Sequence, residues 1–388
     1  MSMEMAANAA STVTESQAVK RLFQRIDADH ESFVEQLIEL SQIPAPTFAE
    51  HARAAYVERR MRDAGLSGVR KDAAGNVFGN VEGEAPALMI AAHLDTVFAA
   101  DDDHTVTRDG SRLVGRGIGD NSLGLAAMLE IAALSAELDF GRRVVFVATV
   151  GEEGLGDLNG VRTAVDEHRD LNAFIAIEGH FLEHVVNVGV GSKRVRISVR
   201  GEGGHSWHDY GQPSAIHAAA ETVHRILRLE LPASPRTTVN VGHIEGGEGI
   251  NILARHATLD VDMRSESQEA LDDLAANVSD IIRDVAVTNN VRMDATPVGD
   301  RPVGHIDPNH VLLSAALDSL RNVGVEGQLE TASTDANYPA SLGIPSVCVG
   351  ISTGGGMHTP EEWIDEAKIA TGLKHLLTMV MLAAEARF

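Results

Sequence analysis

Two adjacent carboxylates, Glu152 and Glu153, stand between glycines directly after the apolar run RRVVFVATV. The flanking residues are apolar, so the pair is not part of a solvated charged segment. Like charges side by side raise each other's pKa, and an opposite charge nearby is needed to offset them. Because successive residues of an extended chain point to opposite sides, one carboxylate can bind a cation while the other acts as a base. The pair therefore predicts a cation site with a free carboxylate beside it.

Four further segments carry candidate ligands. AAHLDTV holds His93 and Asp95, which project from the same face of an extended chain. GRGIGDNSLG holds Asp120, IAIEGH holds Glu178, and GISTGGGMHTPEEWI holds His358 after three glycines. Taken singly, each has an ordinary structural explanation, as a surface pair, a turn, a helix cap or a satisfied histidine. Their coincidence near the carboxyl ends of expected strands indicates a site.

The set of candidate ligands indicates which ions the site would take. His93, Asp120, Glu153, Glu178 and His358 provide two imidazoles and three carboxylates. Such nitrogen and oxygen donors suit zinc, cobalt or manganese. If Asp120 bridges, each of two metal ions has three protein ligands and an open position, with the ions about 3.5–4 Å apart around a shared water. The glycines before Asp120 are interpreted as room for the backbone close to a bound ion, and the glycines before His358 as positions that exclude bulk near another group.

Apolar strands alternate with helices around these segments, so we expect an α/β fold with a mostly parallel sheet covered on both faces. Residues 16–41 and 47–64 are expected to form two leading helices, separated by Pro44 and Pro46. The strands that follow end in the candidate ligands. This part of the chain is interpreted as a catalytic domain with a dinuclear metal centre.

The pattern of the sequence changes at residue 191, where KRVRISVRGEG alternates cationic and apolar residues like a strand with one solvated face. The segments that follow predict strand, helix, strand, strand, helix and strand, the order of a ferredoxin-like α+β domain. These segments are 193–201, 214–228, 237–244, 256–264, 268–286 and 291–298. The predicted domains are the first part of the catalytic domain at 1–190, a ferredoxin-like lid at 191–303 and the second part at 304–388.

Composition restricts the partners of this chain. Its 388 residues carry a formal net charge of −24, which repels nucleic acid and anionic lipid and favours a cationic ligand. The single cysteine, Cys348, has no intrachain partner, which fits a reducing cytosol. The first residues, MSMEMAANAASTVTESQ, lack the regions of a signal peptide, and the apolar stretch at 376–384 is shorter than a membrane span. We expect a cytoplasmic protein without a nucleic acid or membrane partner.

The motifs HLDTV, GRGIGDNSLG, GEEG, EGH and HTPEEW occur in an order that resembles the M20 family of co-catalytic zinc peptidases and deacylases over most of the chain. That family includes acetylornithine deacetylase, succinyl-diaminopimelate desuccinylase, glutamate carboxypeptidase, aminoacylase and peptidase T. The resemblance implies that His93 and Glu178 bind one metal ion, Glu153 and His358 the other, and Asp120 both. It also implies a split catalytic domain around a ferredoxin-like lid.

The resemblance implies further roles around the metal ions. Glu152 would be the general base for the bridging water, and Asp95 would orient the histidine two residues before it. In the lid, His205 of GEGGHSW would stabilise the oxyanion in the site of a neighbouring subunit, which implies a homodimer. Asn251 and Arg264 would hold the substrate, the arginine through a carboxylate. A surface histidine, a turn asparagine and a strand-edge arginine are the structural alternatives.

Four other residues could contribute to the site, but the sequence does not indicate which substrate the site prefers. Ser122 stands where many members of the family carry Lys or Arg after the bridging Asp. His180 could be a further ligand or a structural residue, and Asp335 or Asn337 could line a pocket or form an ordinary turn. Deacylase or carboxypeptidase action needs a grip on a carboxylate, whereas aminopeptidase action needs an acidic contact for the amine.

The favoured hypothesis is metal-dependent hydrolysis of an amide or peptide bond in a small peptide or N-acyl amino acid. Two divalent ions would be bound, zinc before cobalt or manganese. An alternative is a catalytically silent metal- or ligand-binding relative on the same fold, although a pure binder has no use for the base Glu152. A two-metal phosphoesterase would need cationic phosphate clamps, which the net charge of −24 disfavours.

Overall fold

The computed structural model describes residues 15–386. The chain divides into two compact units. Unit 1 combines the chain up to Gly189 with the chain from Gly304 onward, and unit 2 is Val190–Val303. The prediction about a signal peptide concerns the first residues of the chain, which lie largely outside the described range.

A nine-stranded sheet forms the centre of unit 1, in the order β1-β2-β6-β3-β7-β17-β8-β15 with β16 beside β8. The central pairs β6–β3, β3–β7 and β7–β17 are parallel, whereas β1, β2 and β15 run antiparallel to their neighbours. The central strands are continuous apolar runs because both of their faces are covered. The strands are β1 (Ser67–Lys71), β2 (Val77–Val81), β3 (Glu84–His93), β6 (Arg142–Thr149), β7 (Leu171–Glu178), β8 (His184–Gly189), β15 (Gly304–His305), β16 (Gln328–Ala332) and β17 (Ser346–Gly350).

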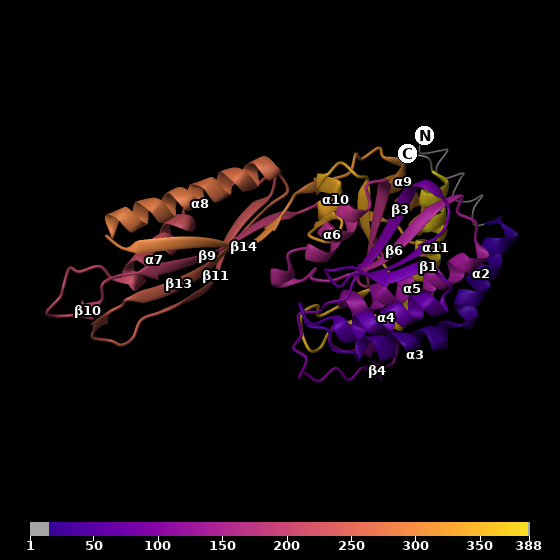
Figure 1. Cartoon of the computed structure of the whole chain (residues 1–388), viewed down its shortest axis with the longest axis horizontal. Helices are drawn as coiled ribbons and strands as arrows, with labels where there is room; N and C mark the ends of the chain where they lie inside the picture. The colour runs from indigo at the N-terminus through magenta and orange to yellow at the C-terminus, as the bar shows by residue number, and fades with distance from the viewer. Residues whose placement is uncertain (1–14, 387–388) are drawn as a thin grey trace. The chain divides into compact units, whose positions relative to one another are not determined.

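Helices cover both faces of this sheet (Figure 1). On one face, α2 to α5, α9 and α11 pack against strand residues that include Ile90 and Phe146. On the other face, α6 and the start of α10 pack against the alternate residues, which include Met89 and Val147. Successive strand residues thus enter opposite cores. The helices are α2 (Gln17–Ala28), α3 (His30–Ser41), α4 (His51–Asp63), α5 (Gly124–Leu134), α6 (Asn159–Glu167), α9 (Val311–Asn322), α10 (Asn337–Ser341) and α11 (Ile369–Glu385).

The expected leading helices differ from those observed. Residues 16–41 form two helices, α2 and α3, because Asp29 between them has φ −91° and ψ 7° and ends the first helix. The next helix, α4, begins at His51 rather than at 47. The preceding residues form a loop in which Pro46 pairs with Thr96, next to the end of β3.

A second, small sheet in unit 1 has the order β18-β19-β5-β4. It joins the chain that leads to Asp120 with the segment around His358, which is distant in sequence. Its strands are β4 (Thr107–Asp109), β5 (Arg112–Val114), β18 (Gly354–Gly355) and β19 (Trp363–Asp365). The main sheet does not carry Asp120 and His358, and the small sheet brings the segments of these two candidate ligands together.

One segment, Glu366–Glu385, is long and apolar enough to cross a membrane by length and composition alone. The expectation of a shorter apolar stretch at 376–384 was wrong in length because α11 already begins at Ile369. Within unit 1, 67% of the apolar window is buried, and α11 packs against α9. This burial is typical of a core helix.

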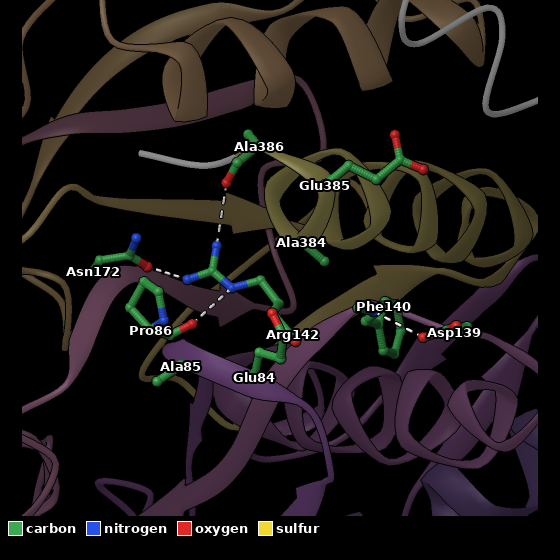
Figure 2. A pocket seen from close by; sticks show the side chains of 11 residues that line it. Glu84, Ala85, Pro86, Asp139, Phe140, Arg142, Asn172, Ala384, Glu385 and Ala386 are labelled. Atoms are coloured by element: carbon green, nitrogen blue, oxygen red, sulfur yellow. Dashed lines mark hydrogen bonds between the residues drawn. The ribbon is translucent and has the colours of Figure 1, made fainter.

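A cavity of about 430 Å³ lies at the amino ends of the central strands, and Figure 2 shows the residues that line it. The guanidinium of Arg142 donates to the backbone oxygens of Pro86, Ala383 and Ala386 and to the side-chain oxygen of Asn172. These bonds tie the end of α11 to the starts of β3 and β7. The cavity lies at the opposite edge of the sheet from the candidate ligands.

Unit 2 is an antiparallel sheet in the order β11-β13-β9-β14, with α7 and α8 packed on one face (Figure 1). The β-α-β-β-α-β order confirms the ferredoxin-like prediction. A separate two-stranded sheet pairs β10 with β12. The elements are β9 (Gly191–Arg200), β10 (Gly204–His205), α7 (Ala215–Ile226), β11 (Thr237–Gly246), β12 (Ile252–Leu253), β13 (His256–Ser265), α8 (Gln268–Thr288) and β14 (Arg292–Arg301).

Candidate metal centre

Three segments with candidate ligands meet at the carboxyl edge of the central parallel strands. β3 ends at His93, β7 ends at Glu178, and Glu152 and Glu153 follow the end of β6. Because β3 lies between β6 and β7 in the sheet, the three strand ends are adjacent. Each apolar run is buried on both faces, so its first polar residues emerge only at this edge.

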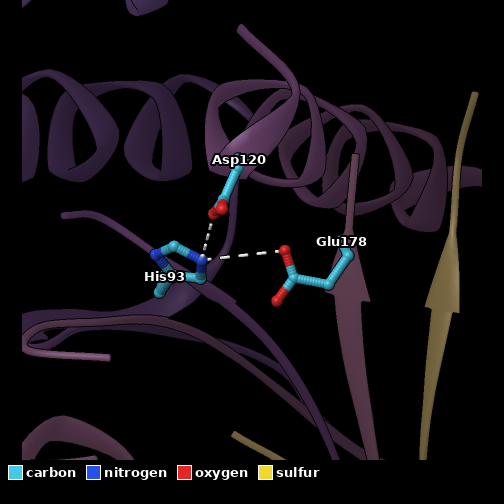
Figure 3. Close-up of side chains that lie close together, drawn as sticks. All are labelled: His93, Asp120 and Glu178. Carbon is cyan, nitrogen blue, oxygen red and sulfur yellow. Dashed lines mark ion pairs between the residues drawn. The ribbon is translucent and has the colours of Figure 1, made fainter. Parts of the chain in front are cut away.

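The side chains of His93, Asp120 and Glu178 converge (Figure 3). His93 Nε2 lies 3.1 Å from Asp120 Oδ1 and 3.7 Å from Glu178 Oε2. On the other side of Asp120, His358 Nε2 lies 3.0 Å from Oδ2 and 3.2 Å from Glu153 Oε1. Each oxygen of Asp120 therefore faces a different imidazole, and each imidazole faces a further carboxylate.

These side chains fit a pair of divalent cations. The five predicted ligands form two groups that share Asp120, and the candidate ligand atoms of each group lie within 4.8 Å of one another. Each group has one imidazole and two carboxylates, a donor set that suits zinc in hydrolases. The His93 side chain is 2% exposed, whereas that of His358 is 50% exposed, so solvent reaches the site on the His358 side.

An irregular turn carries Asp120. The segment η1 (Ile118–Leu123) is a short π-helix before α5, and Asp120 and Asn121 within it have non-helical angles and are joined by a cis peptide bond. The side chain of Asn121 donates a hydrogen bond of 2.7 Å to the backbone oxygen of Ile177 in β7. The turn is thus attached to the strand that ends in Glu178.

Asp95 connects the first ligand segment with the two adjacent carboxylates. Its Oδ1 accepts the N–H of Glu152 at 3.0 Å, and its Oδ2 accepts the N–H of Glu153 and the hydroxyl of Thr47, both at 2.9 Å. His93 Nδ1 lies 3.0 Å from the backbone oxygen of Asp95 and 3.5 Å from its carboxylate. The carboxylate thus lies closer to the backbone of the Glu152–Glu153 turn than to the histidine that it was predicted to orient.

Glu50 and Arg53, which were not among the predicted site residues, are charged side chains that lie behind the site. Arg53 is fully buried and donates to backbone oxygens of the loop 41–43 and of Leu94, the residue before Asp95. Glu50 accepts the N–H of Gly151, directly before the paired carboxylates, at 3.1 Å. The available signal was the position of Arg53 on the apolar face of its helix, where a cation needs buried partners.

Crowding of charged groups shifts the pKa values of the candidate ligands. Hydrogen bonds to Asp120 and Glu153 raise the pKa of His358 to about 10. Burial raises the pKa of Glu178 to about 7, although His93 opposes this shift. Burial alone would lower the pKa of His93, but the charge of Glu178 and a hydrogen bond to Asp120 raise it well above its usual value. In the metal-free protein, protons therefore offset the negative charge of the carboxylates at the positions where cations would bind. Binding of cations would displace these protons.

Comparison with known proteins identifies the family. Residues 89–382 match the sequence model of peptidase family M20/M25/M40. The chain belongs to the M20 family. It is therefore a hydrolytic enzyme that acts on amide bonds, as the motifs predicted. The two ligand groups around Asp120 form the candidate metal centre of this chain.

Relatives of this M20 chain include an N-carbamoyl-L-amino-acid amidohydrolase from Paenarthrobacter aurescens, 25% identical over 85% of this chain and 90% of the relative. A solved tripeptidase from Staphylococcus aureus has a TM-score of 0.80 and 24% identity, covering 92% of this chain and 99% of that one. A dinuclear metal binding M20 peptidase from Bacillus subtilis has a TM-score of 0.69 and 15% identity, covering 92% and 99%. These structures support the fold.

The predicted lid residues of this M20 enzyme lie in unit 2. His205 ends β10, and the backbone oxygen of Asn251 accepts the N–H of Ser206 at 2.9 Å, so the segments of His205 and Asn251 are adjacent. Arg264 lies near the other end of the ten-residue strand β13, and its Nε donates to Asp262 at 2.7 Å. The structure thus brings His205 near Asn251 but not Arg264.

The remaining candidates of the M20 chain lie in unit 1, outside the two ligand groups. His180 Nε2 lies 3.0 Å from Glu362, so this histidine faces a buried carboxylate. Asp335 is buried and accepts the hydroxyl of Thr149 at 2.5 Å. The side-chain oxygen of Asn337 accepts the backbone N–H three residues before it, as in an ordinary turn. Ser122, also buried, lies in η1 beside Asp120.

Proposed function

We propose that this enzyme hydrolyses an amide or peptide bond in a small peptide or N-acyl amino acid at a two-metal centre, with Glu152 as general base. The observation that carries the proposal is the placement of Asp120, whose two oxygens each face a different imidazole at 3.0–3.1 Å. Three carboxylates, Glu152 among them, complete the cluster. A chain that only bound metal would not need this additional buried carboxylate.

Five side chains of this chain would bind the two ions. His93, Glu178 and Asp120 would hold one divalent ion, and Asp120, Glu153 and His358 the other, with zinc preferred over cobalt or manganese. When bound, the ions supply positive charge that acidifies a water and polarises the substrate carbonyl.

Glu152 acts on the proton of the attacking water. Its side chain is buried, and its backbone N–H is fixed by the carboxylate of Asp95. The carboxylate takes a proton from the water and later delivers it to the departing amine. Asp95 holds the turn that carries Glu152 and Glu153, and so keeps the base and the neighbouring ligand in a fixed relation.

Replacing Glu152 by Gln tests the role of the base. The variant keeps the side-chain volume but cannot accept the proton, so we expect about 10²–10⁴-fold lower turnover with unchanged metal content. Glu366→Gln is the matched control, because Glu366 is a buried carboxylate that pairs with Arg108 away from the ligand groups. Elemental analysis and assays on a panel of dipeptides, tripeptides and N-acyl and N-carbamoyl amino acids give the readout. Wild-type turnover in Glu152→Gln on the best substrate would refute the proposal, and no turnover by the wild-type enzyme on any of them would show that its substrate lies outside these classes.

For unit 2, we propose the roles implied by the resemblance to the family. His205 stabilises the oxyanion in the site of a second subunit of a homodimer, and Asn251 and Arg264 hold the substrate. His205 is exposed and therefore accessible to a substrate.

A complementation experiment tests the assignment of His205 across subunits. We expect His205→Ala and Glu152→Gln to be nearly inactive alone, and a mixture of the two to recover activity through mixed dimers. In such a dimer, one site combines an intact Glu152 with the intact His205 of the other subunit. If mixing after unfolding and refolding restores no activity, the assignment across subunits is wrong.

A cytoplasmic location remains part of the proposal. The net charge of −24 and the single buried cysteine support it. Cell fractionation of the tagged protein tests it, and recovery in the membrane fraction would contradict it.

A further inference from the structure

Glu362 is a carboxylate with no exposed surface, and the proposed reaction assigns it no role. Its Oε1 accepts the N–H groups of Gly119 and Asp120 at 2.9 and 2.8 Å, and its Oε2 accepts the N–H of Gly117 at 3.0 Å. His180 Nε2 lies 3.0 Å from Oε1. Within residues 15–386, no Lys or Arg forms an ion pair with Glu362, so amide groups and one imidazole offset its charge.

The imidazole of His180 fits between two glycines. A Cβ atom on Gly119 would lie 2.1 Å from His180 Nε2, and a Cβ atom on Gly354 would lie 2.5 Å from Nδ1. Any larger residue at either position would displace the ring. The space beside Gly119, which was interpreted as room near an ion, is thus occupied by His180. The prediction that the glycines before His358 exclude bulk near another group is confirmed at Gly354.

Glu362 and His180 join three segments of the cluster, those that carry Asp120, Glu178 and His358. Glu362 binds the backbone of Asp120 and belongs to the segment of His358, and His180 follows Glu178 in the same loop. The backbone oxygen of Glu362 also accepts the N–H of Gly115 at 2.9 Å, which fixes the start of the glycine-rich turn. A shift of this carboxylate would therefore move Asp120 relative to both imidazoles.

We infer that Glu362, supported by His180, is a positioning residue that sets the bridging carboxylate of Asp120 and thereby the affinity for both metal ions. This inference rests on the proposed two-metal centre. Residues that orient metal ligands from behind contribute about 10–100-fold to metal affinity. Here the orientation acts through the backbone of the ligand, since Glu362 contacts N–H groups rather than the Asp120 side chain.

Glu362→Gln is the informative variant because it keeps the shape of the side chain. One amide oxygen can still accept the bonds made by Oε1, but the NH₂ group would then face the N–H of Gly117, and two donors cannot bond each other. His180→Phe removes the donor and keeps a ring between the glycines, but its six-membered ring is larger than the imidazole, so the folding of this variant is checked by urea unfolding. Glu366→Gln again serves as the control, because it removes a buried carboxylate that pairs with Arg108 instead of the backbone of this turn.

The test is titration of the metal-free full-length proteins with Co²⁺ in competition with a chelator, followed by the visible absorption of the bound ion. For Glu362→Gln we expect about 10–100-fold weaker binding at both sites and an altered Co²⁺ spectrum, with smaller changes in the same direction for His180→Phe. Glu366→Gln should bind as the wild type does. Urea unfolding of the metal-free proteins shows whether each variant is folded, and His180→Phe carries the test if Glu362→Gln is not.

The outcomes separate this inference from the proposed function. Wild-type affinity and spectrum in a folded Glu362→Gln variant would overturn the inference and leave the two-metal proposal intact. Equal weakening in Glu366→Gln would also overturn it, because the effect would then belong to general loss of stability. If the wild-type protein binds no Co²⁺ at all, the proposed centre and this inference fail together.

Discussion

Substitution of Asp95 by Asn tests how the turn with the paired carboxylates is held. The Asp95 carboxylate accepts three hydrogen bonds, from the N–H groups of Glu152 and Glu153 and from the hydroxyl of Thr47. Asparagine has the same shape but only one acceptor oxygen. If that oxygen takes the place of Oδ2, the bonds to Glu153 and Thr47 remain, and the N–H of Glu152 faces an NH₂ group.

The size of the effect follows from these contacts. A buried N–H without an acceptor costs about 1–3 kcal/mol. The two bonds that remain lose the charge of their acceptor, and bonds to charged groups are about twice as strong as neutral ones. Together we expect the free energy of unfolding of the metal-free protein to fall by about 2–5 kcal/mol. Thr47→Val removes one donor and should cost about 1 kcal/mol.

Urea unfolding at neutral pH measures these values for the metal-free proteins. Asp101→Asn is the control, because Asp101 is exposed and its loss should change stability by no more than about 0.5 kcal/mol. Thr47→Val combined with Asp95→Asn should show coupling, since both changes affect one bond. A loss below about 1 kcal/mol in Asp95→Asn would refute the reasoning, as would strict additivity of the two changes.

Three further predictions concern buried and titrating groups. Burial lowers the pKa of His375 to about 3, so below about pH 6.5 the unfolded chain takes up a proton that the folded chain does not, and stability should fall as the pH decreases. His375→Phe should make the unfolding free energy less steep in pH between about 6.5 and 4, and an unchanged slope would contradict this. Metal binding should release protons near pH 7, because His358 is protonated in the metal-free protein, and calorimetry in buffers of different ionisation enthalpy should detect the release. Apparent affinity should therefore rise with pH, and affinity that is independent of pH would argue against the assigned ligands. Arg53→Lys should lower the unfolding free energy by about 2–4 kcal/mol in urea titrations, because a single ammonium cannot replace the donors that the guanidinium directs to several backbone oxygens. A loss near zero would show that these bonds are dispensable.

The parts of this molecule that sequence could predict are those that leave a local signal. Apolar runs that end in His93 or Glu178 are visible because a strand buried on both faces has no polar residues before its edge. The order of elements in unit 2 could likewise be predicted, because each segment shows its own pattern of alternating polar and apolar residues. The pair Glu152 and Glu153 stands out for the same reason, since charge directly after a buried strand is unusual.

The supporting residues leave a weaker signal, and it does not identify their partners. Glu362 and Arg53 act on backbone groups that are distant in sequence, and nothing in their own segments indicates which groups those are. Gly119 shows the same difficulty, because a glycine indicates close approach without indicating what approaches. Predicting that His180 fills this space requires the packing of the turn against the end of β7, which only the folded chain provides.

Unit 1 is completed by chain that follows unit 2, and this has a consequence for biosynthesis. When a ribosome has made residues up to Gly189, four of the predicted ligands exist, but His358 and Glu362 do not. At 5–20 residues per second, the missing part arrives on the order of ten seconds later. Until then β17 cannot pair with β7, and the second of the two proposed metal sites lacks its imidazole. The nascent chain should therefore be inactive, and a product truncated anywhere before His358 should have no partial hydrolase activity.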